Sequence, residues 1–430
     1  MPSRPDPLTA VLRRFLVVQP SESRALAWAW LYVFALFLSY YVLRPIRDEL
    51  GVAGGVKNLP WLFTGTLVAM LAVNPLFGWA VRRWRRDRFI ALTYRFFMVN
   101  LVAFMVLLAV ATPAQHVWIG RAFFIWVSVF NLFVVSVFWS FIVDVFDAEQ
   151  GKRLFGFLAA GATLGGIAGS ALTSGFVEKL GQHWLLFAAI ALLEVAVFAS
   201  RRLGGVCAAF RRPAPGEEAE RPVGGSVLAG LTHTFRSPYL AGIAVFMLLY
   251  TITSTFLYFQ QATIAEQHFP ERAARTAFFA DLDFWVNTLT LACQLLLTGR
   301  LMPRAGVVLT LGALPLLSTA GFGALAVAPT VAVFVVVQVA RRVSNFALAR
   351  PAREVLYTVV PREDRYKAKV FIDTVVYRGG DQLASWSYAG LAALGLGFTG
   401  ISLVAVPLSM AWLGLSVWLG KRQADRQRAR

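Results

Sequence analysis

The stretch "ALAWAWLYVFALFLSYYVLRPIRDEL", residues 25 to 50, predicts a membrane-spanning helix because most of it is apolar and it is long enough to cross a bilayer. A helix satisfies its own backbone hydrogen bonds, which the hydrocarbon interior of a membrane requires. The stretch ends with four charged residues, Arg44, Arg47, Asp48 and Glu49. Charges at the end of a membrane span are costly, so they indicate a structural or functional use.

Apolar runs of this kind recur along the chain of 430 residues, which is 58% hydrophobic and only 15% charged. This composition is typical of an integral membrane protein. We therefore predict an all-α integral membrane protein with twelve transmembrane helices in two six-helix halves. The predicted spans are 25–46, 59–81, 89–111, 114–144, 153–176, 184–203, 238–262, 277–299, 305–327, 329–349, 366–394 and 398–420.

The lysines and arginines predict the orientation of these helices. If both termini are cytoplasmic, 32 of the 41 lysines and arginines, Arg341 among them, fall in cytoplasmic segments. This distribution follows the positive-inside rule and predicts a multi-pass protein of the cell inner (plasma) membrane. Most of the net charge of +18 then lies in cytoplasmic segments, several of which face anionic lipid headgroups. We therefore expect membrane lipids, and no nucleic acid, as partners of these charges.

A polar stretch divides the chain into two parts. We predict a cytoplasmic tail over 1–24, a six-helix half over 25–203, a cytoplasmic linker over 204–236, a second half over 237–420 and a basic cytoplasmic tail over 421–430. The apolar spacing near the N-terminus indicates a short helix on the membrane surface or, equally, a disordered tail. A shift of 214 residues aligns Gly165-Gly166 with Gly379-Gly380, and such a parallel repeat is typical of the major facilitator architecture.

The sequence lacks the residue patterns that metal binding, nucleotide hydrolysis and enzymatic catalysis require. The four histidines are widely separated and lack metal-ligand spacing, so we predict no metal and no cofactor. No phosphate-binding loop of the G-x-x-x-x-G-K-[ST] type is present, which argues against nucleotide hydrolysis. Serine, histidine and cysteine form no recognisable catalytic constellation, so we expect a protein that is not an enzyme.

Three blocks resemble the ATP/ADP translocase family, a branch of the major facilitator superfamily, and its bacterial relatives. They are "YYVLRPIRDELGV" (40–52), "SVFWSFIVDVFDAEQGKRLFGFLAAGATLGGIAGS" (136–170) and "PAREVLYTVVPREDRYKAKVFIDTVVYRGGDQL" (351–383). The resemblance implies exchange of nucleotides across a membrane by alternating access. It also implies that Arg44, Arg47 and Asp48 match the family's charged motif after the first helix.

The residues of the first block share one helix face. Tyr40, Arg44 and Arg47 follow at i, i+4 and i+7, and the planar guanidinium group suits phosphate oxygens. Arg47 is the stronger candidate for an anion. Arg44 has a structural alternative, because it could pair with Asp48 at i+4. Pro45 predicts that the helix is kinked or broken here.

The sequence departs from the family at other positions. Where characterised nucleotide carriers have acidic residues, this chain has Val127 and Tyr258, and Arg378 and Asp381 lie near the position of a functional lysine. Asp381 shares a helix face with Asp373, and an internal ion pair with Arg378 is the alternative to substrate binding. The identity of the anion is therefore less well defined than its charge.

Other polar and aromatic residues of the spans have two interpretations each. Asp281 and Asp283 either gate transport or lie in the outer interface, and Asp144 is a candidate latch for the basic loop at 78–89. Amides such as Asn131 and Gln261 either bind a base or sugar or form interhelical hydrogen bonds. Trp139 and Tyr258 either stack on a purine or pack within the bundle. Gly161, Gly165 and Gly169 predict a close helix crossing.

The leading hypothesis is a secondary transporter that exchanges nucleotides of the ATP/ADP type, or similar phosphorylated anions. One alternative keeps the fold but changes the cargo to another anionic metabolite, with proton coupling through an aspartate. A second alternative is a non-transporting membrane sensor or scaffold. The expected partners are a small-molecule anion and membrane lipids, and a monomer is consistent with the sequence, which leaves the oligomeric state open.

Overall fold

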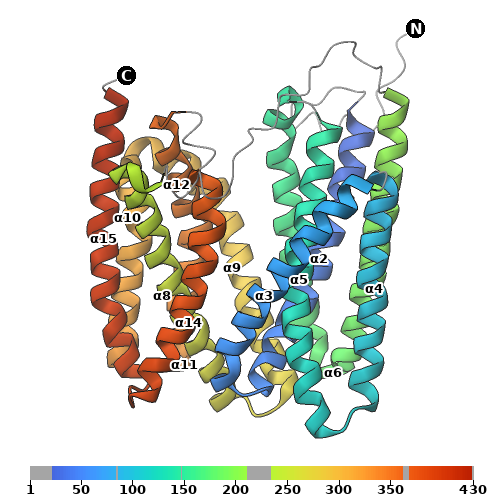
Figure 1. The fold of residues 1–430 in the computed structure, drawn as a ribbon, viewed down its shortest axis with the longest axis horizontal. Helices are drawn as coiled ribbons and strands as arrows, with labels where there is room; N and C mark the ends of the chain where they lie inside the picture. The colour runs from blue at the N-terminus through green and yellow to red at the C-terminus, as the bar shows by residue number, and fades with distance from the viewer. Residues whose placement is uncertain (1–21, 84–85, 147, 211–233, 362–367, 429–430) are drawn as a thin grey trace. The chain divides into compact units, whose positions relative to one another are not determined.

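The computed structural model describes residues 22–83, 86–146, 148–210, 234–361 and 368–428, which are almost entirely helical (Figure 1). The surface helix predicted near the N-terminus and most of the predicted linker lie outside the described residues. Within the described part, nine helices are long and apolar enough to cross a membrane. The all-α membrane fold predicted from the sequence is confirmed.

The described part of the first half of the chain contains five helical segments longer than one turn. They are α2 (Ser23–Ala53), α3 (Leu59–Arg83), α4 (Arg86–Val110), α5 (Pro113–Val145) and α6 (Ala148–Phe210), with a short 3-10 helix η1 (Val56–Asn58) before α3. α6 contains two of the predicted spans, because the chain reverses at Gly181, whose φ of 77° suits glycine. These segments therefore account for the first six predicted spans.

The second half contains the remaining six spans. It comprises α8 (Pro238–His268), α9 (Arg272–Cys293), η2 (Gln294–Thr298), α10 (Gly299–Val327), α11 (Val331–Ser344), η3 (Asn345–Ala349), α12 (Arg350–Leu356), η4 (Tyr357–Val359), η5 (Ile372–Val376), α14 (Tyr377–Ala393) and α15 (Phe398–Arg428). The segments η2, η3 and η5 are π-helical, and η4 is a 3-10 helix. A positive φ of 72° at Gly306 divides α10.

Contacts group the chain into two compact units, and each has its own core. Unit 1 comprises Met1–Gly54, Gly65–Pro215 and Phe269–Asn287, so it includes the first part of α9. Unit 2 comprises Gly55–Thr64, Gly216–His268 and Thr288–Arg430. The boundaries predicted for the two halves at 25–203 and 237–420 remain predictions.

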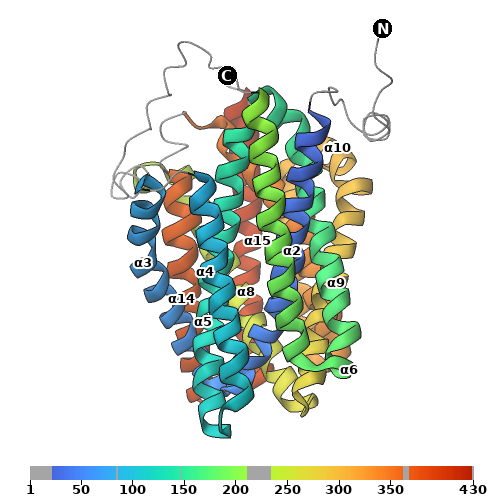
Figure 2. The same ribbon diagram turned by 90° about the vertical axis from the view of Figure 1, so that its right-hand side faces the viewer.

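In unit 1, α2 packs closely along α6, and the two helices lie side by side in Figures 1 and 2. The glycines of α6 make this possible: a Cβ atom at Gly165 would lie 2.5 Å from the carbonyl oxygen of Phe34, and one at Gly169 would lie 2.5 Å from that of Leu38. No larger side chain fits without a shift of the backbone. The close crossing predicted from the small-residue spacing is confirmed.

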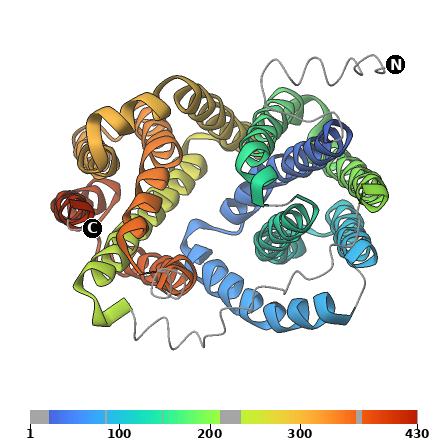
Figure 3. The same cartoon turned by 90° about the horizontal axis from the view of Figure 1, so that it is seen from above.

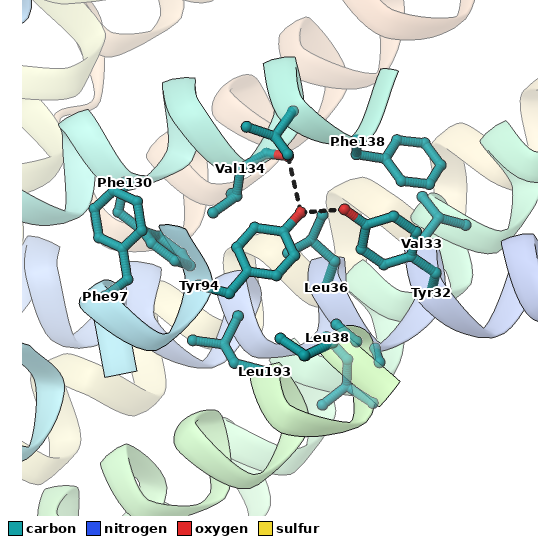
Figure 4. Close-up of a cluster of buried hydrophobic side chains, with 14 of the residues drawn as sticks. Tyr32, Val33, Leu36, Leu38, Tyr94, Phe97, Phe130, Val134, Phe138 and Leu193 are labelled. Carbon is teal, nitrogen blue, oxygen red and sulfur yellow. Dashed lines mark hydrogen bonds between the residues drawn. The ribbon is translucent and has the colours of Figure 1, made fainter. Parts of the chain in front are cut away.

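The core of unit 1 is apolar and aromatic. Tyr32 of α2 and Tyr94 of α4 are fully buried, and their hydroxyl groups hydrogen-bond to each other (Figure 4). The hydroxyl of Tyr94 also donates to the carbonyl oxygen of Val134, 3.4 Å away. Because each buried hydroxyl has a partner, the two tyrosines tie α2, α4 and α5 together without an unsatisfied polar group.

In unit 2, α8 packs against α14 and α10 packs against α15, and Figure 3 shows these helices end-on. A Cβ atom at Gly380 would lie 3.0 Å from Cβ of Thr251 and 3.3 Å from Cδ1 of Leu248. Gly380 of α14 thus lies against side chains of α8, as Gly165 and Gly169 of α6 lie against α2. This correspondence agrees with the repeat predicted at an offset of 214 residues.

The first helix continues past Pro45, where the sequence predicts either a kink or a break. The helix is not broken there, because α2 runs through Pro45 to Ala53. Proline removes one backbone donor, but a transmembrane helix tolerates it where neighbouring helices pack around it. Pro45 is buried in the contact with its neighbours. Arg44, Arg47, Asp48 and Glu49 therefore lie within the helix, not beyond its end.

Candidate functional site

The two arginines in the charged turns of α2, Arg44 and Arg47, each form an ion pair. Nη1 of Arg44 lies 3.2 Å from Oδ1 of Asp283 on α9, within unit 1. Arg47 donates from Nε and Nη2 to Oδ1 of Asp48, at 2.9 and 2.5 Å. The structure therefore replaces the predicted alternative pair of Arg44 with Asp48, because each arginine has a different carboxylate as its partner.

The two arginines remain accessible although they are paired. The side chains of Arg44 and Arg47 are 21% and 15% exposed, whereas their carboxylate partners are almost fully buried. The carboxylates are thus more deeply buried than the arginines that they pair with, and each arginine side chain keeps some exposed surface. Because charge-assisted hydrogen bonds are strong where water is scarce, these groups favour an anion over a neutral ligand.

Aromatic rings hold the guanidinium groups in place. The guanidinium carbon of Arg47 lies 4.8 Å from the ring centre of Phe124 on α5, and that of Arg44 lies 5.7 Å from the ring centre of Tyr41. The ring of Tyr40 contacts Tyr41 edge to face, with centroids 5.4 Å apart. Such cation–π contacts orient arginine without neutralising its charge.

The acidic residues of α9 differ in their surroundings. Asp283 is 3% exposed and pairs with Arg44. Asp281 is exposed and accepts a hydrogen bond from Ser174 of α6. Gating by either residue remains a prediction.

Glu49 is the centre of a polar cluster that the sequence did not predict. Its side chain is fully buried, and its carboxylate accepts hydrogen bonds from Arg272 at 3.1 and 3.4 Å and from Arg275 at 3.1 Å. Gln182 of α6 donates to the same carboxylate at 3.1 Å. The partners of Glu49 are more than 130 positions away in the chain, so local spacing contains no signal for them.

The residues predicted on α5 show mainly packing contacts. The ring of Trp139 contacts Phe138 and Phe155 edge to face, with centroids 5.2 and 5.8 Å apart. Asn131 is half-buried, and Asp144 is exposed near the end of α5. The ring contacts of Trp139 agree with the packing alternative. Substrate binding by Asn131 and Trp139, and a latch at Asp144, remain predictions.

In unit 2, the charged residues of the eleventh span form ion pairs. Nη1 of Arg378 lies 3.6 Å from Oδ2 of Asp381, and Thr255 of α8 donates to Oδ1 of Asp381 at 3.2 Å. Asp373 pairs with Arg353 of α12 at 3.7 Å. The ion pair between Arg378 and Asp381, predicted as the alternative to substrate binding, is present.

Tyr258 and Gln261 of α8 have protein partners in unit 2. The ring of Tyr258 contacts Phe63 edge to face at 5.6 Å. Gln261 accepts a hydrogen bond of 2.7 Å from Gln338 of α11. Both contacts agree with the packing and interhelical alternatives, and substrate binding by the two residues remains a prediction.

Arg341 lies inside the predicted span 329–349, although the positive-inside count assigns its charge to a cytoplasmic segment. The structure buries it in α11, with 2% of its surface exposed. Hydropathy cannot show that neighbouring helices cover such a charge, so its burial is new information from the structure.

For metals, the described residues contain no group of three or more histidines, cysteines or acids that could hold an ion.

The fold and these intramembrane charges define a class: multi-span α-helical transporters with ionisable residues inside the bundle. Within this class, the chain belongs to the major facilitator superfamily, because the family model described as Major Facilitator Superfamily matches residues 25–368. The chain is therefore a secondary transporter with the two-half architecture of that superfamily.

Solved structures with this fold are similar over nearly the whole chain. A bacterial homologue of the iron transporter ferroportin, in an inward-facing state, has a TM-score of 0.66 at 11% identity and covers 94% of this chain and 98% of its own. An auto-inhibited peptide transporter of the POT family has a TM-score of 0.61 at 16% identity, with 94% and 97% covered.

A bacterial homologue of the human lysosomal transporter Spinster, in an inward-facing and unoccupied conformation, has a TM-score of 0.53 at 14% identity, with 96% and 98% covered. No curated protein matches the sequence significantly. At these identities the solved structures define the fold and leave the substrate open.

Proposed function

We propose that this transporter exchanges nucleotides of the ATP/ADP type, or similar phosphorylated anions, by alternating access. The observation that carries the proposal is the pair Arg44 and Arg47 within a membrane span, each held by a buried carboxylate and still partly exposed. Two neighbouring guanidinium groups on one helix can bind a phosphate chain through several charge-assisted hydrogen bonds. The resemblance of residues 40–52 to the ATP/ADP translocases supports the nucleotide.

The orientation and surroundings form part of the same proposal. Both termini lie in the cytoplasm, the membrane is the cell inner membrane, and the partners are lipid and the anionic substrate. The distribution of lysine and arginine supports this orientation. Protease protection of tags at the two termini in sealed vesicles tests it.

Uptake into proteoliposomes tests the proposed substrate. Purified protein is reconstituted into liposomes preloaded with ADP, and the entry of labelled ATP is followed. The double variant Arg47→Gln with Asp48→Asn keeps the local charge balanced and nearly the same shape. We expect it to fold and to lose uptake, because the guanidinium group that meets the phosphate is gone. Normal uptake by this variant would contradict the role of Arg47.

A second candidate is proton-coupled transport of another anionic metabolite. The observation that favours it is that the accessible arginines are paired with buried carboxylates, Arg44 with Asp283 and Arg47 with Asp48. A proton that binds such a carboxylate would release its arginine for an anion, and proton movement would then be coupled to anion transport. Uptake that requires a pH gradient, and is independent of internal nucleotide, would support this candidate over exchange.

A further inference from the structure

Arg341 of α11 is a buried cation whose described partners are all neutral. Its Nε donates to the hydroxyl of Ser318 on α10 at 3.0 Å. Its Nη2 donates to the hydroxyl of Thr253 at 2.7 Å and to the carbonyl oxygen of Tyr250 at 3.3 Å, both on α8. Three helices of unit 2 thus fix the direction of the guanidinium group.

No acid among the described residues balances the charge of Arg341. Among the described residues no carboxylate forms an ion pair with it, whereas Arg44, Arg275 and Arg353 each pair with one. Its Nη1 forms no hydrogen bond within the described part of the chain. An uncompensated buried charge is destabilising, so such a group persists where a ligand of opposite charge supplies the balance.

Partly exposed polar residues surround this arginine. Asn345 donates to the hydroxyl of Tyr250 at 3.1 Å, and the ring of Tyr250 faces that of Tyr377 at 6.5 Å. The guanidinium carbon of Arg341 lies 5.7 Å from the ring centre of Tyr250. Tyr250, Asn345 and Tyr377 are each half-buried, so a ligand can approach the arginine along their side chains.

The backbone near this group is irregular on two helices. The π-helical segment η3 begins at Asn345, and the π-helical segment η5 ends directly before Tyr377. Single π-helical turns are often retained at functional sites because they re-aim side chains at some cost in backbone hydrogen bonding. Both irregular turns therefore place a polar side chain beside Tyr250.

We propose that Arg341, Tyr250, Asn345 and Tyr377, here called the Arg341 cluster, form an anion-binding subsite of unit 2. Nη1 of Arg341 binds an anionic oxygen, Asn345 donates to a neighbouring oxygen, and the two tyrosine rings flank the ligand. Its requirement for an anion comes from the uncompensated charge. The assignment of that anion as a phosphate group of the transported molecule rests on the proposed function.

Ligand-induced thermal stabilisation of the purified full chain tests the subsite. The probes are ATP, sodium pyrophosphate, sodium sulfate and sodium citrate, compared with sodium chloride at the same ionic strength. The variants are Arg341→Gln and Arg341→Lys, and the control is Arg95→Gln, which removes an exposed arginine of the same kind. The measured quantities are the unfolding temperature without ligand and the apparent Kd for each probe.

We expect Arg341→Gln to weaken binding of the stabilising anion about tenfold or more, because one charge-assisted contact is lost. Arg341→Lys keeps the charge and retains part of the affinity, and Arg95→Gln retains all of it. Without ligand, Arg341→Gln should unfold at the same or a higher temperature, because an unbalanced charge is removed. A purely structural arginine would instead show a lower unfolding temperature and an unchanged affinity, which would overturn the proposal.

The remaining outcomes separate the subsite from the proposed function. If pyrophosphate, sulfate or citrate binds in an Arg341-dependent way and ATP does not, the subsite stands and the nucleotide assignment fails. If ATP binds equally well to the wild type and to Arg341→Gln, the proposed function stands and the subsite is refuted. If no anion stabilises the wild type, the subsite is refuted as well.

Discussion

Replacement of Glu49 by glutamine should strongly destabilise unit 1. Glu49 is fully buried and receives Arg275, which is only 12% exposed, and Arg272, which is 40% exposed. The substitution keeps the shape of the side chain but leaves two guanidinium groups without their negative partner. Breaking a buried ion pair on one side costs about 3–5 kcal/mol, and the exposure of Arg272 reduces its share.

We therefore expect a loss of about 3 kcal/mol for Glu49→Gln, which lowers the unfolding temperature by roughly 5 °C. The assay is thermal unfolding in detergent, followed by the fluorescence of a thiol-reactive or intrinsic probe. The matched control is Glu194→Gln, the same substitution in the pair with Arg95, where both side chains are about half exposed. It should change stability by less than about 1 kcal/mol.

The comparison of these two variants is decisive. Equal unfolding temperatures for Glu49→Gln and Glu194→Gln would contradict this prediction. Burial would then not change how much an ion pair contributes to the free energy of unfolding. A second check is the double variant Glu49→Gln with Arg275→Gln. It should recover part of the loss, since it removes the buried charge that the single variant leaves unpaired.

Three further predictions concern packing and coupling. Gly165→Leu should prevent folding, seen as the loss of the monodisperse peak in size-exclusion chromatography, because the Cβ atom of the leucine would lie 2.5 Å from a backbone oxygen. The control Gly175→Leu should fold normally, because no atom lies within 4 Å of the added Cβ. Tyr32→Phe should lower the unfolding temperature by roughly 2 °C through the loss of one buried hydrogen bond worth about 1 kcal/mol, and the double variant with Tyr94→Phe should recover some of that loss. If the transporter works by exchange, Asp381→Asn should take up ATP against internal ADP with or without a pH gradient, as the wild type does. If instead the wild type needs a pH gradient and Asp381→Asn loses this gradient-driven uptake, Asp381 is the group that couples proton movement to transport.

Much of the fold follows from local sequence signals. Apolar runs predict the spans because hydrocarbon requires about twenty apolar residues per helix, a purely local condition. The small-residue spacing of Gly161, Gly165 and Gly169 predicts the close crossing of α2 and α6 for the same reason, since side-chain size at i and i+4 is visible in the sequence. The repeat at 214 residues also follows from the sequence itself.

The ion pairs of the candidate site are harder to predict from the sequence, because the paired residues are distant from each other in the chain. Spacing pairs Arg44 with Asp48, whereas the structure pairs Arg44 with Asp283 on α9. The carboxylate of Glu49 and the burial of Arg341 depend on which helices pack side by side, and hydropathy does not determine helix rotation. At Pro45 the local tendency of proline to break a helix does not decide the outcome, because α2 continues through this buried residue.

The most direct test of nucleotide exchange is the uptake of labelled ATP into proteoliposomes under four conditions: with or without internal ADP, and with or without an imposed pH gradient. Exchange predicts rapid uptake whenever ADP is inside, little uptake into empty vesicles, and no dependence on the gradient. Uptake into empty vesicles that follows the pH gradient, or no uptake of any nucleotide with ADP inside, would contradict the proposed function.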